Sequence, residues 1–200
     1  MKLYYSPGAC SMAVHIALRE AGIPVDLVLV DLATHKLADG TDYYTISPCG
    51  YVPLLELDDG SRHTEASALL QYVGDLDPTG ALLPRAGTRE RLETVGWLAF
   101  IATEIHKGFS PLWRSDTPAS VKETTIAALN RRFADLDARL AKSETLTGKF
   151  SVADAYAFTV VGWSRLLSMS LASFPNLEAY LGRIAARPKV VEALKAEGLA

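Results

Sequence analysis

Cys10 is the first side chain in this sequence whose type and position could support chemistry. It follows an apolar run at residues 2–5 and a Ser-Pro-Gly-Ala break, and it opens a segment whose apolar residues have helical spacing. A thiol at the amino end of a helix faces unpaired backbone N–H groups and the positive end of the helix dipole, and both favour the thiolate. We therefore predict a reactive thiol with a lowered pKa; a small buried side chain is the alternative.

Val52-Pro53 and Glu65 are candidates for binding a peptide-like ligand. Pro53 has no N–H and fits the start of a strand, with either a cis or a trans bond before it. A cis bond would leave the Val52 N–H and C=O free to pair with an extended peptide. Glu65 begins a predicted helix, where its carboxylate could bind an ammonium group while first-turn N–H groups bind a carboxylate; helix capping is the alternative role.

His106 and Lys107 form a polar strip with Thr103 and Ser110 on a long predicted helix. Such a strip suits the wall of a cleft, and a solvated face explains it equally well. The four histidines show neither HxxxH nor HxH spacing, and none has a cysteine partner at zinc-finger spacing. We therefore predict no metal site.

The elements that must position these residues fall into two groups, of which the first contains strands. Strands are predicted at residues 2–5, 25–30, 52–57 and 61–63, and helices at residues 10–21 and 64–76. A helical crossover makes the first two strands parallel, and Asp58-Asp59-Gly60 favours a tight hairpin between the last two. Residues 31–51 are predicted as a loop with one short helix.

The second group is helical throughout. Pro and Gly residues frame a linker at residues 78–86, and apolar residues then recur at helical spacing from Leu92 to Leu112. Further helices are predicted at residues 119–142, 152–168, 176–186 and 189–196. Ser151 and Asp154 have capping-box spacing after Phe150, which predicts a folding role. We expect an α/β domain at residues 1–77 and an all-helical domain at residues 87–200.

Composition excludes several classes of protein. The formal net charge is −3, which provides no basic footprint for nucleic acid. No stretch approaches the ~20 apolar residues of a membrane-spanning helix, and a Pro and a Gly interrupt the first residues where a secretory signal needs an apolar core. Two cysteines are too few for a disulfide framework and are better interpreted as thiols in a reducing compartment. We expect a cytoplasmic protein with no nucleic-acid or membrane partner.

Five segments together resemble the bacterial beta-class glutathione S-transferases. They are YYSPGACSMAVHIAL, GYVPLLELDDG, HTEASALLQYV, FIATEIHKGFSPLWR and FSVADAYAFTVV, and the match runs along nearly the whole chain in the family's order. The resemblance implies a thioredoxin-like domain of βαβ-ββα order that binds glutathione as co-substrate. It also implies a C-terminal all-helical bundle that supplies most of an apolar electrophile pocket, a homodimer, and detoxification as the function.

The resemblance implies roles for individual residues. Cys10 would lie beside the glutathione sulfur with His106, and Ser11 would be the alternative activating group. Val52 would pair with the cysteinyl part before a cis Pro53, and Glu65 would hold the γ-glutamyl end. The other implied glutathione contacts are Ala9, His35, Lys36, Tyr51, Ala66, Ser67, Lys107 and Glu104 of the partner subunit, and the implied pocket residues are Tyr5, Phe109, Leu112, Trp113 and Trp163.

Four positions depart from the family pattern. His35 stands where relatives often carry a lysine aimed at the glycyl carboxylate, Ala66 stands where many carry a serine, and Ala99 stands where an asparagine can reach across the dimer. These changes weaken the expected grip on glutathione. Cys49 is not expected from the family, and it is interpreted either as a second redox thiol or as an exposed bystander.

Three functions are consistent with these residues. The first is conjugation, in which the glutathione thiolate attacks an apolar electrophile. The second is glutaredoxin-like thiol–disulfide chemistry through Cys10, with a mixed disulfide to glutathione. The third is a non-catalytic ligand-binding or scaffold protein that keeps the same fold.

Overall fold

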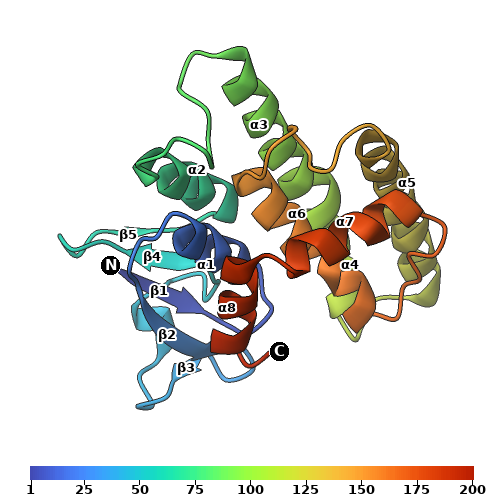
Figure 1. Ribbon diagram of the computed structural model, residues 1–200. Helices are drawn as coiled ribbons and strands as arrows, with labels where there is room; N and C mark the ends of the chain where they lie inside the picture. The colour runs from blue at the N-terminus through green and yellow to red at the C-terminus, as the bar shows by residue number, and fades with distance from the viewer.

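A five-stranded mixed sheet forms the first half of the structure, a computed structural model that describes residues 1–200 (Figure 1). The strands are β1 (Lys2–Tyr5), β2 (Asp26–Asp31), β3 (Lys36–Leu37), β4 (Leu54–Glu56) and β5 (Arg62–His63), in the spatial order β3-β2-β1-β4-β5. β1 is parallel to β2, as the predicted crossover requires, and every other neighbouring pair is antiparallel. β3 is an additional strand in the segment predicted as a loop, whose expected short helix is the 3-10 helix η1 (Tyr43–Thr45).

β1 is the central strand and is buried on both faces. The helices of this half are α1 (Ser11–Glu20) and α2 (Ala66–Leu76). Leu3 lies in the large apolar core together with residues of both helices. Tyr4 points to the opposite face, as alternation along a strand requires, and packs in a smaller cluster with Tyr43 and Val52. The βαβ-ββα arrangement predicted for a thioredoxin-like domain is therefore confirmed, with β3 added at the edge.

Helices alone make up the second half, as predicted. They are α3 (Arg89–Phe100), the π-helix η2 (Ile101–His106), the 3-10 helix η3 (Lys107–Phe109), α4 (Ser110–Trp113), α5 (Ala119–Leu140), α6 (Val152–Leu166), α7 (Pro175–Ala185) and α8 (Pro188–Ala196). No helix combines the length and the apolar character that crossing a membrane requires.

The single long helix predicted for residues 92–112 is wrong in two respects. The segment changes from α to π geometry at Ile101 and to 3-10 geometry at Lys107. Its apolar stripe also starts later than predicted, because Leu92 is 73% exposed and the buried face begins at Thr94 and Leu98. The wider π-turn shifts the register of the side chains, and such turns often occur at functional sites.

The two halves share one continuous apolar core. α1 packs against α6 and against α8, which returns to the side of the sheet domain (Figure 1). The segment between α2 and α3 is ordered by hydrogen bonds. The Asp77 carboxylate accepts the N–H groups of Thr79, Ala81 and Leu82. Leu82 is itself buried, and its carbonyl accepts the N–H of Val152. The domain limits at residues 77 and 87 stay a prediction.

Asp154 anchors the start of α6, as the capping-box pattern predicts. Its Oδ2 accepts the Ser151 N–H at 2.9 Å, and its Oδ1 accepts the Leu146 N–H at 2.9 Å and the Tyr180 hydroxyl at 3.0 Å. Burial raises the pKa of this carboxyl, and the hydrogen bonds oppose the shift. Phe150, which precedes the capping box, contacts the Arg187 guanidinium, whose carbon lies 3.9 Å from the ring centre.

Candidate active site

Cys10 occupies the N-cap position of α1, and its thiol donates to the carbonyl oxygen of Val52 at 3.2 Å. Burial raises the pKa of this thiol to about 12, whereas the backbone N–H groups of Cys10 and Ser11 lower it. The charge of Glu65 adds to the upward shift. The predicted lowered pKa is therefore wrong for the protein without ligand, because the desolvation of the enclosed sulfur exceeds the effect of the helix terminus.

The Val52-Pro53 peptide bond is cis, as the resemblance implies. The Val52 side chain is buried, and its N–H makes no hydrogen bond within the protein. The carbonyl of the preceding residue, Tyr51, accepts a hydrogen bond from the Tyr43 hydroxyl at 2.9 Å, which fixes the loop before Val52. The residue whose carbonyl accepts the Cys10 thiol thus also carries a free backbone donor.

Glu65 lies at the N-cap of α2 in a left-handed conformation, with φ of 69°. A non-glycine residue at this φ is strained, and strained residues cluster at binding sites. The turn also explains why α2 begins at Ala66 rather than at the predicted residue 64. The N–H groups of Ala66 and Ser67 have no acceptor in the protein, so the helix start offers an exposed carboxylate beside two free donors.

His106 is the last residue of the π-helix η2, and its Nδ1 lies 2.5 Å from the hydroxyl oxygen of Tyr156. Burial lowers the pKa of this imidazole to about 4, and the neighbouring Lys107 charge acts in the same direction. Burial also raises the pKa of Tyr156, with contributions from Cys10 and Glu65. The imidazole of His106 is therefore neutral at pH 7. Tyr156 lies close enough to Cys10 and Glu65 of the sheet domain for their charges to affect its pKa.

Tyr156 was missed by the sequence analysis. It is 2% exposed and lies seven residues before Trp163, on the same face of α6. Its hydroxyl, on a predicted helix face made mostly of apolar residues, was the signal that could have found it.

Trp163 connects the sheet domain to the helical half. Its indole N–H donates to the Gly8 carbonyl at 2.8 Å. Its ring centre lies 5.0 Å from that of His106 and 5.7 Å from that of Trp113. Trp113 is half exposed and forms the accessible side of the aromatic cluster, and Leu112, the preceding predicted pocket residue, is partly buried.

Three predicted site residues are placed differently from the expectation. Ser11 is fully buried, and its hydroxyl bonds to the N–H and the carbonyl of Ser6. Phe109 is fully buried behind Trp163, and Tyr5 is buried beside His15, with ring centres 6.5 Å apart. All three support the walls of the site from within the core, which leaves no exposed surface on Ser11 or Phe109 for a ligand.

The remaining predicted contacts lie at the edges. Lys36, Tyr51 and Lys107 are exposed, whereas Ala9 and Ser67 are partly buried. Glu104 pairs with Arg132 of the same chain at 3.1 Å. Ala99 and Cys49 are exposed, and Cys49 is a free thiol.

His35 adopts a left-handed conformation with φ of 52° and stacks on Tyr44, with ring centres 4.6 Å apart. Its Nδ1 is buried without a hydrogen-bond partner. Gly50 fits against both rings, because a Cβ there would lie 2.7 Å from Tyr44 Cε1 and 2.9 Å from His35 Nδ1. His35 is thus packed under the loop that leads to Tyr51 rather than extended as a lysine would be.

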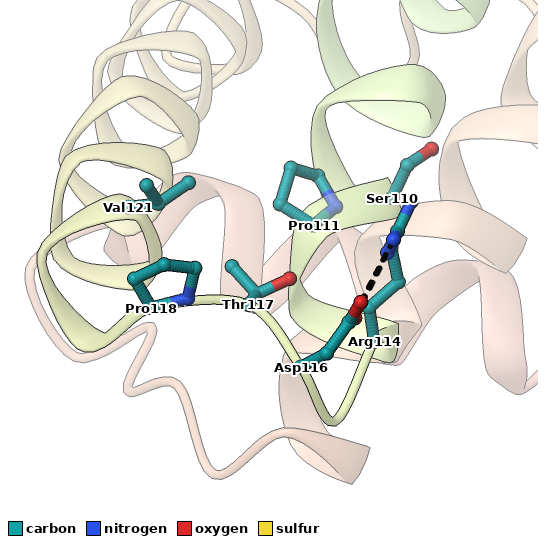
Figure 2. A pocket seen from close by; sticks show the side chains of 7 residues that line it. All are labelled: Ser110, Pro111, Arg114, Asp116, Thr117, Pro118 and Val121. Atoms are coloured by element: carbon teal, nitrogen blue, oxygen red, sulfur yellow. Dashed lines mark hydrogen bonds and ion pairs between the residues drawn. The ribbon is translucent and has the colours of Figure 1, made fainter.

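Two further observations bear on what the site could hold. A surface pocket of about 450 Å³ is lined by residues between Ser110 and Val121, with the Arg114–Asp116 ion pair, at 2.9 Å, along one side of it (Figure 2). None of the catalytic candidates lines this pocket. No group of three or more His, Cys, Asp or Glu side chains is arranged to hold a metal ion.

Comparison with known proteins relates this geometry to one family. The family model described as the N-terminal domain of glutathione S-transferase matches residues 8–76, and that of the C-terminal domain matches residues 100–188. Glutathione S-transferase GstA of Escherichia coli O157:H7 is 44% identical over 200 residues, with both chains covered completely.

Two solved structures superpose over the full length of both chains. One is a beta-class glutathione S-transferase of Sphingomonas chungbukensis, with a TM-score of 0.95 and 46% identity. The other is a sphingomonad glutathione S-transferase complexed with glutathione, with a TM-score of 0.95 and 44% identity.

Proposed function

This chain belongs to the glutathione S-transferase family. From that premise, we propose that the protein binds glutathione with the glutathione sulfur between Cys10 and His106, and that it transfers the glutathionyl group to an apolar electrophile. One observation carries the proposal: the Cys10 thiol contacts the Val52 carbonyl beside an unpaired Val52 N–H. The cysteinyl part of glutathione, as an extended peptide, can pair with Val52 in the manner of an added strand. That pairing brings its sulfur to the start of α1.

The start of α2 suits the γ-glutamyl end of the same ligand. An α-amino acid carries both an ammonium and a carboxylate group, and Glu65 complements the first. The free N–H groups of Ala66 and Ser67, at the positive end of an eleven-residue helix, complement the second. The backbone supplies this anion site, so the serine that Ala66 replaces is not required.

Conjugation is the reaction that the site without ligand supports better than disulfide exchange. With a pKa of about 12, the Cys10 thiol of the unliganded site is protonated at pH 7, so it can donate its S–H to a glutathione thiolate. His106 is neutral, and if the Tyr156 hydroxyl donates to Nδ1, the ring proton lies on Nε2 and is available to the same sulfur. In the reaction the thiolate forms a C–S bond to the electrophilic carbon, whose leaving group departs with its electron pair.

The apolar side chains of Trp113, Leu112 and Trp163 are the proposed contacts for the electrophile. We further propose a homodimer, which sedimentation would test, and a cytoplasmic location, which the free thiols Cys10 and Cys49 support. The two-domain division at residues 77 and 87 is part of the same proposal.

Calorimetry with glutathione, followed by a conjugation assay with chlorodinitrobenzene, tests this function. Glu65→Gln should weaken glutathione binding by about tenfold or more, because it removes the charge that pairs with the ammonium group. Glu90→Gln is a matched control, since Glu90 is an acidic residue in the first turn of another helix, α3. Absence of binding at millimolar glutathione, or equal binding by Glu65→Gln and the control, would contradict the proposal.

Cys10→Ala separates the two chemistries. As a donor, Cys10 contributes to conjugation, so its removal should lower kcat about tenfold and leave residual activity from His106. Conjugation at the full rate together with complete loss of glutathione-dependent disulfide reduction would instead assign Cys10 to redox work.

A further inference from the structure

Gly8, two residues before Cys10, is held from both sides by the helical half of the chain. Its N–H donates to Oε2 of Glu197 at 3.0 Å, and its carbonyl accepts the Trp163 indole N–H at 2.8 Å. The two peptide groups that flank Gly8 are thus anchored separately. Since φ at Gly8 is 69°, which few side chains tolerate, the anchors maintain a conformation that glycine alone adopts readily.

Glu197 is itself fixed inside the protein. Its Oε1 lies 2.9 Å from Nδ1 of His15, and both side chains are completely buried. The Arg19 guanidinium, which can only donate, approaches Nε2 of His15 at 3.2 Å. His15 therefore accepts at Nε2 and donates from Nδ1, so each carboxylate oxygen of Glu197 receives one donor.

The residues after α8 also cover this loop. The closest atom to the position of a Cβ on Gly8 is Cδ1 of Leu199, at 3.6 Å. The tail thus packs on the loop through Leu199 and binds it through Glu197. Neither residue belongs to the glutathione contacts proposed above.

Trp163 extends the same support to the second catalytic group. Its ring lies edge-on to His106, with the ring centres 5.0 Å apart, while its N–H is used by Gly8. One side chain therefore sets the spacing between the loop that carries Cys10 and the helix that carries His106.

We propose that Glu197 and Trp163 are positioning residues for the transfer reaction, which hold the loop at residues 6–9 so that the sulfur of Cys10 stays against Val52 and in register with His106. This inference rests on the proposed role of Cys10. It assigns Trp163 a second role beside lining the electrophile site, and it makes the segment that follows α8 part of the active site.

The test uses Cys49→Ser as background, so that Cys10 is the only thiol. Glu197→Gln places an amide NH2 group against either the Gly8 N–H or the His15 Nδ1–H, so that one of these two hydrogen bonds is lost. Trp163→Phe removes the indole N–H that binds the Gly8 carbonyl but keeps an aromatic ring. Each should raise the KM for glutathione at least about fivefold, because the Val52 pairing depends on the loop. Each should also speed alkylation of Cys10 by iodoacetamide and shift its pH profile downward, because the released thiol is less buried.

Glu192→Gln on α8, which removes a surface ion pair with Lys189, is the matched control and should match the background. A merely structural role would lower the amount of active protein, and with it apparent kcat, without changing KM or the alkylation profile of the folded fraction. If Glu197→Gln does not fold, Trp163→Phe decides. A KM and an alkylation rate within about twofold of the background would overturn the inference, whereas failure of the background protein to bind glutathione would overturn the proposed function instead.

Discussion

Protonation of His106 should destabilise the folded protein in a way that one substitution can isolate. The imidazole is mostly buried, and burial lowers its pKa from 6.5 to about 4. A histidine with a lowered pKa adds stability above its unfolded-state pKa, and that stability is lost as the pH falls from about 6.5 to about 4.

The two pKa values give the size of the effect. At pH 5 nearly all unfolded chains carry the proton and few folded ones do, so linkage predicts a loss of about 2 kcal/mol relative to pH 7. At pH 4 the loss reaches about 3 kcal/mol.

Urea unfolding at pH 7 and pH 5, at one fixed protein concentration, measures this loss for the parent and for His106→Asn. Other groups titrate in both proteins, so the difference between their two pH dependences reports His106 alone. The parent should lose about 2 kcal/mol more than the variant. Equal losses would show that His106 titrates like an unperturbed histidine, which would refute the lowering of its pKa by burial.

Three further substitutions test other parts of the structure. Tyr156→Phe removes the partner of the His106 Nδ1 and should lower kcat for conjugation about tenfold with little change in the KM for glutathione, in steady-state assays. Asp154→Ala leaves buried donors unpaired and should lower the free energy of unfolding by about 3 kcal/mol or more, whereas Asp135→Ala at an exposed position should change it by less than about 1 kcal/mol. Gly50→Ala should lower the melting temperature more than Gly60→Ala. Both glycines have positive φ, but only at Gly50 would a Cβ lie against His35 and Tyr44. Equal shifts in melting temperature would rule out the clash.

Local patterns predicted the parts of the fold that depend on short-range physics. The turn before Cys10, the Asp-Gly hairpin and the Ser151–Asp154 cap lie where spacing and residue type placed them, because each needs only a few neighbouring residues. β3 was not predicted, since two residues at a sheet edge leave no period to detect. The π-helix that ends at His106 was also not predicted, because its side-chain spacing differs from that of an α-helix by only about one residue per turn.

The chemistry of the site was harder to predict than its location. The position of Cys10 suggested a lowered pKa, but the amount of protein around the sulfur, which no local pattern reports, reverses the shift. Tyr156 and Glu197 act through contacts that span 50 and 189 residues of sequence. The burial of Ser11 and Phe109 likewise depends on how the two halves pack.

The packing of α1 against α6 and α8 has a consequence for synthesis of the chain. α1 ends at Glu20, whereas α8 begins only at Pro188. At roughly 5–20 residues per second, a ribosome needs on the order of ten to thirty seconds to deliver the covering helix after α1 has emerged. During that interval the apolar side of α1 is open to chaperones and to other nascent chains, so slower translation should increase aggregation.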